Sequence, residues 1–315
     1  MGRMTETLTR SFEVFRRLEL VVTRRLDGLL HGDHESLFPG PGSEPADART
    51  YLPGSDDVRR MDWNVTARTS EPHVRDLVAD RELETWMVVD ASASMDFGTG
   101  QAEKRDLAIA AVAAVGFLTE RTGNRVGAYV LRGRTPRRIP ARTGRSHLFS
   151  LLNSLASGER AAEGSGSVGL GDALRLLART QHRRGLIVVI SDFLDGGSPP
   201  PWEQPIRLLG TRHQLLAVEV TDPRELTLPE VGMLTLVDPE TGRRREVSTA
   251  SARLRERYAE AARAQRAEVA AALRRAGAAH LRLRTDEDWL RAIVRHVMAQ
   301  RRLARLTPPT GGGAA

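Results

Sequence analysis

An aspartate and two serines follow the most apolar stretch of the chain at alternating positions. Residues 85–89 are almost wholly apolar, and Asp90, Ser92 and Ser94 come directly after them. A strand without polar alternation is buried on both faces, which predicts a central place in a parallel sheet. Open α/β folds bind ligands at the carboxyl ends of such strands. One carboxylate and two hydroxyls there predict a site for a hard divalent cation, because Mg²⁺ and Mn²⁺ prefer oxygen ligands.

A second strand of the same kind supplies a further carboxylate. Residues 185–191 form another mostly apolar run, and Asp192 follows. Between the two strands lies a polar, glycine-rich loop, residues 163–170, which contains Ser165 and Ser167. Since Asp and Ser are also frequent in turns, polar loops without a metal are the alternative interpretation.

The spacing D-x-S-x-S at residues 90–94 resembles the metal-ion-dependent adhesion site of von Willebrand factor A domains. That resemblance implies that Asp192 belongs to the same site and that a threonine hydroxyl from a third loop reaches the metal. Aligning the glycine-rich loop on Leu170 places Val168 at the threonine position, where an apolar side chain cannot ligate. Ser167, the adjacent residue, is therefore predicted to replace the threonine as the hydroxyl ligand, and Ser165 is a poorer candidate.

A longer pattern precedes the first strand. Residues 51–68, YLPGSDDVRRMDWNVTAR, resemble the signature Y-x-P-G-D-D-x-R-x-I-D-W-x-x-x-A-R of the bacterial family called domain of unknown function 58. The resemblance extends over residues 18–195 and keeps the order of signature, D-x-S-x-S and Ser-Asp. Two positions depart from it, because Ser55 is an extra residue in the turn and Pro45 stands where the family has phenylalanine.

The family resemblance implies a function as well as a fold. It implies a non-enzymatic, divalent-metal-dependent protein-interaction module, an adaptor that works with a MoxR-type AAA+ ATPase in complex assembly or maturation. Mg²⁺ or Mn²⁺ would join this chain to an acidic side chain of the partner. The alternative is a metal-dependent hydrolase that uses a cation-bound water, for which the sequence shows no evident general base. The predicted metal site comprises Asp90, Ser92, Ser94, Ser167 and Asp192.

Composition restricts the other classes of function. A net charge of +7 would suit nucleic acid, but the arginines are interspersed with acidic residues and only 4% of residues are aromatic. A solvated charged surface is therefore expected, with no nucleic-acid partner. Lys104, the single lysine, does not follow a glycine-rich turn, so the chain has no P-loop. Without cysteines or an apolar run of membrane-spanning length, a soluble cytoplasmic protein is expected.

Hydrophobic periodicity predicts the elements that must position the site. An amphipathic helix over residues 12–30 lies in an N-terminal segment, 1–37, and the signature segment with short strands follows as residues 38–84. Strands and helices alternate over residues 85–306, which predicts a doubly wound, mostly parallel α/β sheet. With the resemblance, this is a von Willebrand factor A-like (Rossmann-like) domain with an N-terminal helix and a small β extension. Residues 307–315 are predicted to be disordered.

The predicted strands are 86–90, 125–131, 137–141, 186–191, 214–221 and 279–284. The predicted helices are 102–121, 146–156, 172–180, 203–209, 250–276 and 288–306. A hairpin is predicted over residues 234–247, with its turn at residues 239–242.

Overall fold

The computed structural model describes residues 16, 19–20, 22, 48–51, 61, 63–69, 71–75, 84–100, 102–161, 164 and 166–306. The predicted tail 307–315, most of the predicted helix 12–30, residues 52–60 of the signature and Ser165 lie outside these residues. The chain divides into two units, one of residues 34–82 and the other of residues 1–33 and 83–315.

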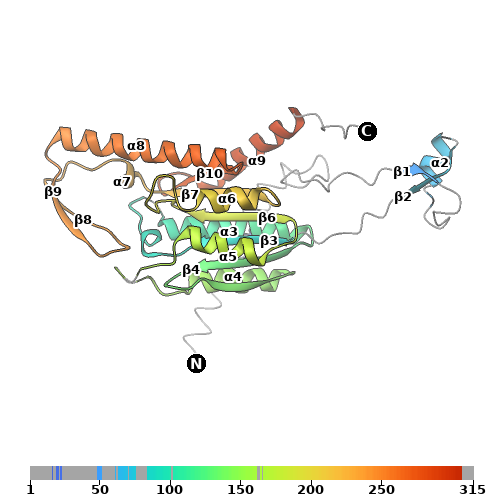
Figure 1. Ribbon diagram of the computed structural model, residues 1–315, viewed down its shortest axis with the longest axis horizontal. Helices are drawn as coiled ribbons and strands as arrows, with labels where there is room; N and C mark the ends of the chain where they lie inside the picture. Colours follow the sequence, from blue (N-terminus) through green and yellow to red (C-terminus); the bar gives the residue numbers. More distant parts are fainter. Residues whose placement is uncertain are drawn as a thin grey trace, which may run out of the picture. The chain divides into compact units, whose positions relative to one another are not determined.

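In its described residues, the smaller unit has a short antiparallel ladder and a helix. Strand β1 (Ala48–Thr50) pairs with β2 (His73–Arg75), and helix α2 (Trp63–Thr69) lies between them in the sequence (Figure 1). The backbone N–H of His73 donates to the hydroxyl of Thr66, which ties the helix to the second strand.

The larger unit is built on a six-stranded sheet in the order β10-β7-β6-β3-β4-β5. All neighbouring pairs are parallel except β4 and β5, which are antiparallel. The predicted doubly wound, mostly parallel α/β fold is therefore confirmed. The strands are β3 (Glu84–Asp90), β4 (Arg125–Leu131), β5 (Arg137–Arg142), β6 (Gly185–Ser191), β7 (Gln214–Thr221) and β10 (Ala279–Arg284).

The burial of the strands explains this order. Strands β3 and β6 are parallel neighbours in the centre of the sheet, as predicted, and nearly every residue in them is buried. Strand β5 carries Pro140, which has no backbone N–H to donate and so suits an edge position. The central strands therefore bring their carboxyl ends, with Asp90 and Asp192, to one edge of the sheet.

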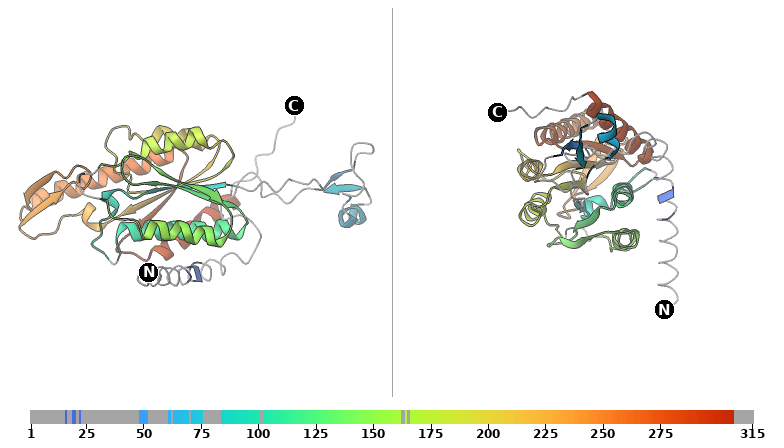
Figure 2. Two further views of the ribbon diagram at one scale, coloured as in Figure 1. Left: turned by 90° about the horizontal axis from the view of Figure 1, so that it is seen from below. Right: turned by 90° about the vertical axis from the view of Figure 1, so that its right-hand side faces the viewer.

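Helices cover both faces of the sheet (Figure 2). Helix α3 contacts β3, β4, β6, β7 and β10 and packs against α4, whereas α5 and α6 pack together, and α6 also contacts α8. A short 3₁₀ turn, η2 (Ala93–Met95), follows β3. The helices are α3 (Lys104–Arg121), α4 (Arg145–Ala156), α5 (Leu170–Thr180), α6 (Glu203–Gly210), α7 (Pro223–Leu226), α8 (Ala252–Arg275) and α9 (Trp289–Leu306).

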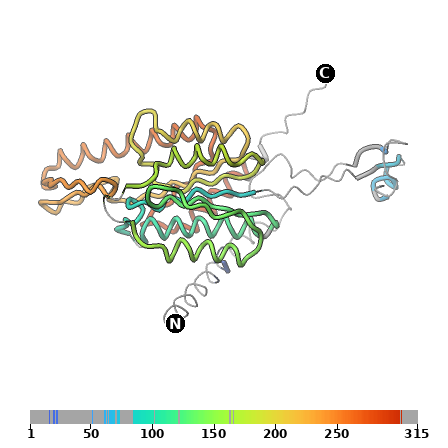
Figure 3. Tube along the Cα trace, turned by 60° about the horizontal axis from the view of Figure 1, so that its bottom comes forward, coloured from blue at the N-terminus to red at the C-terminus, as the bar shows by residue number. Residues whose placement is uncertain are grey.

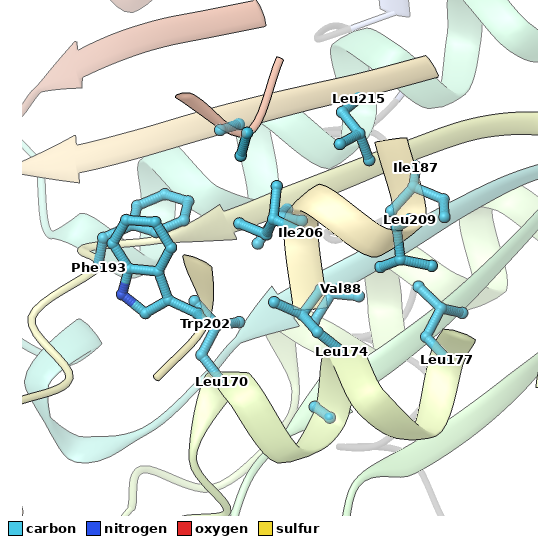
Figure 4. Close-up of a cluster of buried hydrophobic side chains, with 14 of the residues drawn as sticks. Val88, Leu170, Leu174, Leu177, Ile187, Phe193, Trp202, Ile206, Leu209 and Leu215 are labelled. Carbon is cyan, nitrogen blue, oxygen red and sulfur yellow. The ribbon is translucent and has the colours of Figure 1, made fainter. Parts of the chain in front are cut away.

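The core under α5 and α6 holds the segment that follows β6 in place. Phe193 and Trp202 are almost fully buried, and their rings meet edge to face with centroids 5.1 Å apart (Figure 4). Leu170 and Leu174 of α5 and Ile206 of α6 fill the space beside them (Figure 4). Burying such side chains contributes about 1.5–3 kcal/mol each, so this packing fixes the backbone next to Asp192.

The larger unit also contains a short helix that was not predicted and the hairpin that was. Helix α7 was not predicted, because it has only four residues. The predicted hairpin is present as β8 (Met233–Val237) and β9 (Arg244–Ser248), which form a separate two-stranded sheet. Together with the N-terminal half of α8, it lies beyond the carboxyl ends of the central strands (Figures 1 and 3). Among the described residues, no helix combines the length and the hydropathy of a membrane span.

Candidate functional site

All five predicted site residues line one cavity at the carboxyl edge of the sheet. The cavity has a volume of about 1200 Å³ and extends from the ends of β3 and β6 to the β8–β9 hairpin. Its wall contains the predicted set, namely Asp90, Ser92, Ser94, Ser167 and Asp192. A large concave site with several convergent polar groups is the usual form of a binding site.

Asp90 is a buried carboxylate held in a fixed orientation. Its Oδ1 accepts the backbone N–H of Ser92 at 3.0 Å, and its Oδ2 accepts the hydroxyl of Ser191 at 2.7 Å. Burial, together with repulsion from Asp192, raises the pKa of Asp90 to about 6 in spite of these hydrogen bonds. Among the described residues, no ion pair joins this carboxylate to a positive side chain.

Asp192 has such a partner in Lys104. The Lys104 ammonium is fully buried and lies 2.8 Å from Asp192 Oδ2 and 2.5 Å from Glu225 Oε1. Burial alone would raise the pKa of Asp192, but attraction and hydrogen bonding to Lys104 outweigh it and hold the pKa below its ordinary value. The pKa of Lys104 is raised for the same reason, because its two acidic neighbours outweigh the effect of burial.

The ion pairs continue from Lys104 into α8. Arg266 donates to the backbone carbonyl of Asp192 at 2.7 Å, to Glu219 at 3.1 Å and to Glu225 at 3.0 Å. Glu219 is fully buried and also lies 2.8 Å from the ring of His280. The carboxyl edge of β6 is thus joined to α7, α8 and β10 by one network of charged groups.

The hydroxyl groups of the site come from two loops. The Oγ atoms of Ser92 and Ser94 lie 3.1 Å apart, and the Ser167 hydroxyl donates to Glu240 at 3.0 Å. Val168 packs against the hydrophobic core and also lines the cavity, as Ser167 does. Of the two side chains, Ser167 is the one with an oxygen that could serve as a ligand.

The backbone after Asp192 is strained. Phe193 has a φ of 56°, which a residue with a bulky side chain rarely adopts. Its N–H donates to the Ser191 hydroxyl at 3.1 Å, and the N–H of Leu194 donates to Asp192 Oδ1 at the same distance. Such strain, of order 1–3 kcal/mol, clusters at functional sites, where the surrounding packing maintains it.

The side-chain chemistry of these residues suits a hard divalent cation. The donors are carboxylate and hydroxyl oxygens, and negative charge gathers around the cavity: burial, with Asp192, Glu240 and Asp172 nearby, raises the pKa of Asp195. Lys104 already neutralises Asp192, however. Asp90 has a raised pKa, so a cation bound there would stabilise its charged form. In the described part of the chain, no group of three His, Cys, Asp or Glu side chains has the arrangement of a metal cluster.

Three participating residues were not identified from the sequence. Lys104 carried a detectable signal, since all but one of the 47 Lys and Arg residues are arginine and a lone lysine indicates a position that requires an ammonium. Glu225 lies in Asp222-Pro-Arg-Glu225, a capping box with proline at N1 that marks a short helix. Glu240 had no such signal, because a turn sequence does not indicate which distant loops the turn will contact.

Comparison with known proteins places the chain in a family. Residues 47–268 match the model of the family described as "Protein of unknown function DUF58". The chain belongs to this family. The resemblance of residues 51–68 to the family signature is thereby confirmed, and the match covers β3, β6 and the cavity residues between them.

Relatives and solved structures extend the comparison. "Uncharacterized protein Rv1480" of Mycobacterium tuberculosis is 54% identical over 287 residues, which are 91% of this chain and 89% of that protein. "Uncharacterized protein MAV169" of Mycobacterium avium is 46% identical over 165 residues, 52% of this chain and 95% of that protein.

Among solved structures, BatB from Bacteroides thetaiotaomicron has a TM-score of 0.40 at 17% identity, over 70% of this chain and 99% of that chain. The SpRpn10 VWA domain has a TM-score of 0.36 at 10% identity, over 74% and 99% respectively. The fold assignment rests on the strand order and not on these partial likenesses.

Proposed function

We propose that the chain is a non-enzymatic protein-interaction module that uses the cavity at the carboxyl edge of its sheet to bind an acidic side chain of a partner. The observation that supports this most is the pairing of two unlike carboxylates in one cavity, Asp192 neutralised by Lys104 and Asp90 without a cation of its own. A buried carboxylate whose pKa is raised in a cavity is typical of a functional site.

The chain's own residues have separate parts in this proposal. Asp90, Ser92, Ser94 and Asp192 would hold Mg²⁺ or Mn²⁺, which when bound would offer an open coordination position to a carboxylate. Lys104 keeps Asp192 ionised and oriented, since it occupies Oδ2 while Leu194 N–H occupies Oδ1. The Ser191 hydroxyl donates to Asp90 Oδ2, so hydrogen bonds orient both carboxylates that line the cavity.

As the partner we propose a MoxR-type AAA+ ATPase in the cytoplasm, with the chain as an adaptor in complex assembly or maturation. The family resemblance supports this choice, and so does Lys104, which is committed to two carboxylates and is therefore not a phosphate-binding lysine. The hydrolase alternative has weaker support. The feature that favours it is the raised pKa of Asp90, which suits a general base, but both Asp90 oxygens already accept hydrogen bonds from Ser92 and Ser191.

The proposal is tested by measuring association between this chain and an ATPase of that class with excess Mg²⁺ or with chelator. The experiment is run without nucleotide, because the ATPase needs Mg²⁺ for ATP. We expect chelator, Asp90→Asn and Ser94→Ala each to weaken association by about tenfold or more, equivalent to about 1.4 kcal/mol. Ser150→Ala, the same change at an exposed position of α4, is the matched control and should have no effect.

Salt separates this mechanism from diffuse charge attraction. Exposed charges are screened over about 8–10 Å at physiological ionic strength, so a contact made through the cavity should respond less to moderate salt than to chelator. Association that survives chelator and collapses in moderate salt would mean that the arginine-rich surface, and not the cavity, binds the partner.

A further inference from the structure

The turn of the β8–β9 hairpin places a carboxylate of the chain itself in the cavity. Glu240 Oε1 accepts the backbone N–H of Ser94 at 3.2 Å, and Oε2 accepts the hydroxyl of Ser167 at 3.0 Å. The two donors belong to the loops after β3 and before α5, which are far apart in the sequence. Each oxygen of one carboxylate therefore meets one donor from the predicted site.

The turn that carries Glu240 has a defined conformation. The side chain of Asp238 accepts the backbone N–H of Glu240 at 3.0 Å and the hydroxyl of Thr241 at 2.5 Å. The N–H of Gly164 donates to the carbonyl of Pro239 at 3.0 Å, which fastens the turn to the glycine-rich loop. These bonds present the Glu240 side chain to the cavity.

Strand pairing does not attach the hairpin to the central sheet. Strands β8 and β9 pair only with each other within the described part of the chain, and an isolated two-stranded sheet has marginal stability. On the outer face of β8, Met233 and Val237 are exposed. The hydrogen bonds of Glu240 and of Pro239 at the turn are therefore among the contacts that keep the hairpin over the cavity.

Electrostatics leave the two hydrogen bonds to hold Glu240 in this position. Glu240 adds a negative charge to a cavity that already contains Asp90, Asp192 and Asp195, and it is one of the charges that raise the pKa of Asp195. Without its two hydrogen bonds, a carboxylate would be repelled from this position. The donors Ser94 and Ser167 are thus specific for the charge and shape of a carboxylate.

We propose that the Ser94 N–H and the Ser167 hydroxyl form a carboxylate-binding subsite, that Glu240 is its resident ligand, and that an acidic side chain of a partner enters by displacing the β8–β9 turn. The part that concerns the partner rests on the proposed function, whereas the subsite itself needs neither metal nor partner. Because Glu240 is tethered, it competes at an effective concentration in the millimolar range.

The first measurement is amide hydrogen exchange at Ser94 in chelator, with no partner present. In Glu240→Ala we expect exchange about tenfold faster than in the wild type, the factor for loss of one charge-assisted hydrogen bond. Glu246→Ala, the same change at an exposed position of β9, should leave Ser94 unchanged. Equal exchange at Ser94 in all three proteins would overturn the proposal.

The second measurement uses propionate as a free probe of the subsite, observed through the Ser94 amide resonance. In Glu240→Ala, propionate should shift this resonance at a concentration about tenfold lower than in the wild type, while neutral propionamide should not shift it. Equal sensitivity of the two proteins to propionate would contradict a resident Glu240. Since both measurements are made in chelator, their failure would leave the proposed function standing, and a failed association experiment would leave the subsite standing.

Discussion

At the scale of single residues, two aspartates in one cavity have opposite environments. Asp192 accepts the ammonium of Lys104, which lowers its pKa, whereas burial and the charge of Asp192 raise the pKa of Asp90 to about 6. The fixed ammonium does for Asp192 what a bound cation would otherwise do. It also limits the affinity for a dication, because a second positive charge near Lys104 is unfavourable.

The pKa of Asp90 predicts how stability depends on pH in the absence of metal. Between its ordinary pKa of 3.8 and about 6, the folded chain holds a proton on Asp90 that the unfolded chain has lost. The contribution of Asp90 to stability is therefore complete below pH 3.8 and is lost as the pH rises to about 6. Asp90→Asn should remove this dependence and raise the free energy of unfolding at pH 7.5 by up to about 3 kcal/mol.

The measurement is chemical denaturation in chelator at several pH values from 4 to 8. Asp172→Asn is the control, because its side chain is 65% exposed and its ion pair with Arg175 contributes little. If Asp90→Asn is less stable than the wild type at pH 7.5, then Asp90 is not a destabilising buried charge.

At the scale of elements, the sequence predicted most of the sheet and its helices. Apolar runs such as residues 186–190 identify central strands, because a strand without polar alternation must be covered on both faces. Helix α5 begins at Leu170, two residues before the predicted start, since Asp195 from another loop accepts the Leu170 N–H at 2.8 Å. Such a tertiary cap is invisible to local patterns.

Part of the candidate site was also predictable from the sequence. Asp90 and Asp192 followed from strand ends, a rule that depends only on chain order. Lys104, Glu225 and Glu240 did not, because Lys104 pairs with Glu225 across α3 and α7, and Glu240 reaches the site from the hairpin turn. Contacts between elements that are distant in the sequence do not appear in the periodicity of any one element.

The attachment of α8 to the site predicts a large effect of one substitution. Arg266→Met would leave the buried carboxylate of Glu219 without its guanidinium and remove the bond to the Asp192 carbonyl. Breaking a buried ion pair in this way costs about 3–5 kcal/mol, and we expect a loss of about 3 kcal/mol because His280 can still donate to Glu219. Arg263→Met, at an exposed position one turn earlier in α8, is the matched control.

Denaturation at pH 7.5 gives the loss of stability, and hydrogen exchange locates it. Exchange should accelerate in the N-terminal half of α8 and in α7 more than in β3. Similar stability for the Arg266 and Arg263 variants would show that the charged network is not what attaches α8 to the sheet.

At the scale of the whole molecule, the chain is basic while its cavity is acidic. The net charge is +7, yet Asp90, Asp192, Asp195 and Glu240 all line one cavity. Many arginines are balanced locally, as Arg105 is by Asp96. Seven acidic side chains and two arginines, Arg160 and Arg224, line this cavity in all, so a cation would be attracted there more than to the rest of the surface.

This contrast makes thermal stability a specific reporter of cation binding. At a Mn²⁺ concentration ten times its Kd, binding to the folded state alone stabilises the chain by about 1.4 kcal/mol, which corresponds to a rise in Tm of about 3 °C. Because the surface is positively charged overall, weak binding elsewhere should add little. Asp90→Asn should abolish the rise although that variant is more stable in chelator, and Ser167→Ala should reduce it.

The comparison is made at constant ionic strength, with NaCl in place of MnCl₂, so that screening of the net charge cancels. The half-maximal rise should need millimolar rather than micromolar Mn²⁺, since Lys104 neutralises Asp192 and Val168 takes the place of a ligating threonine. A rise of the same size in Asp90→Asn would place the cation outside the cavity. No rise at millimolar Mn²⁺ in the wild type would mean that Lys104 alone serves as the cation of this site, and that an acidic partner is received by the Ser94 and Ser167 donors without a metal.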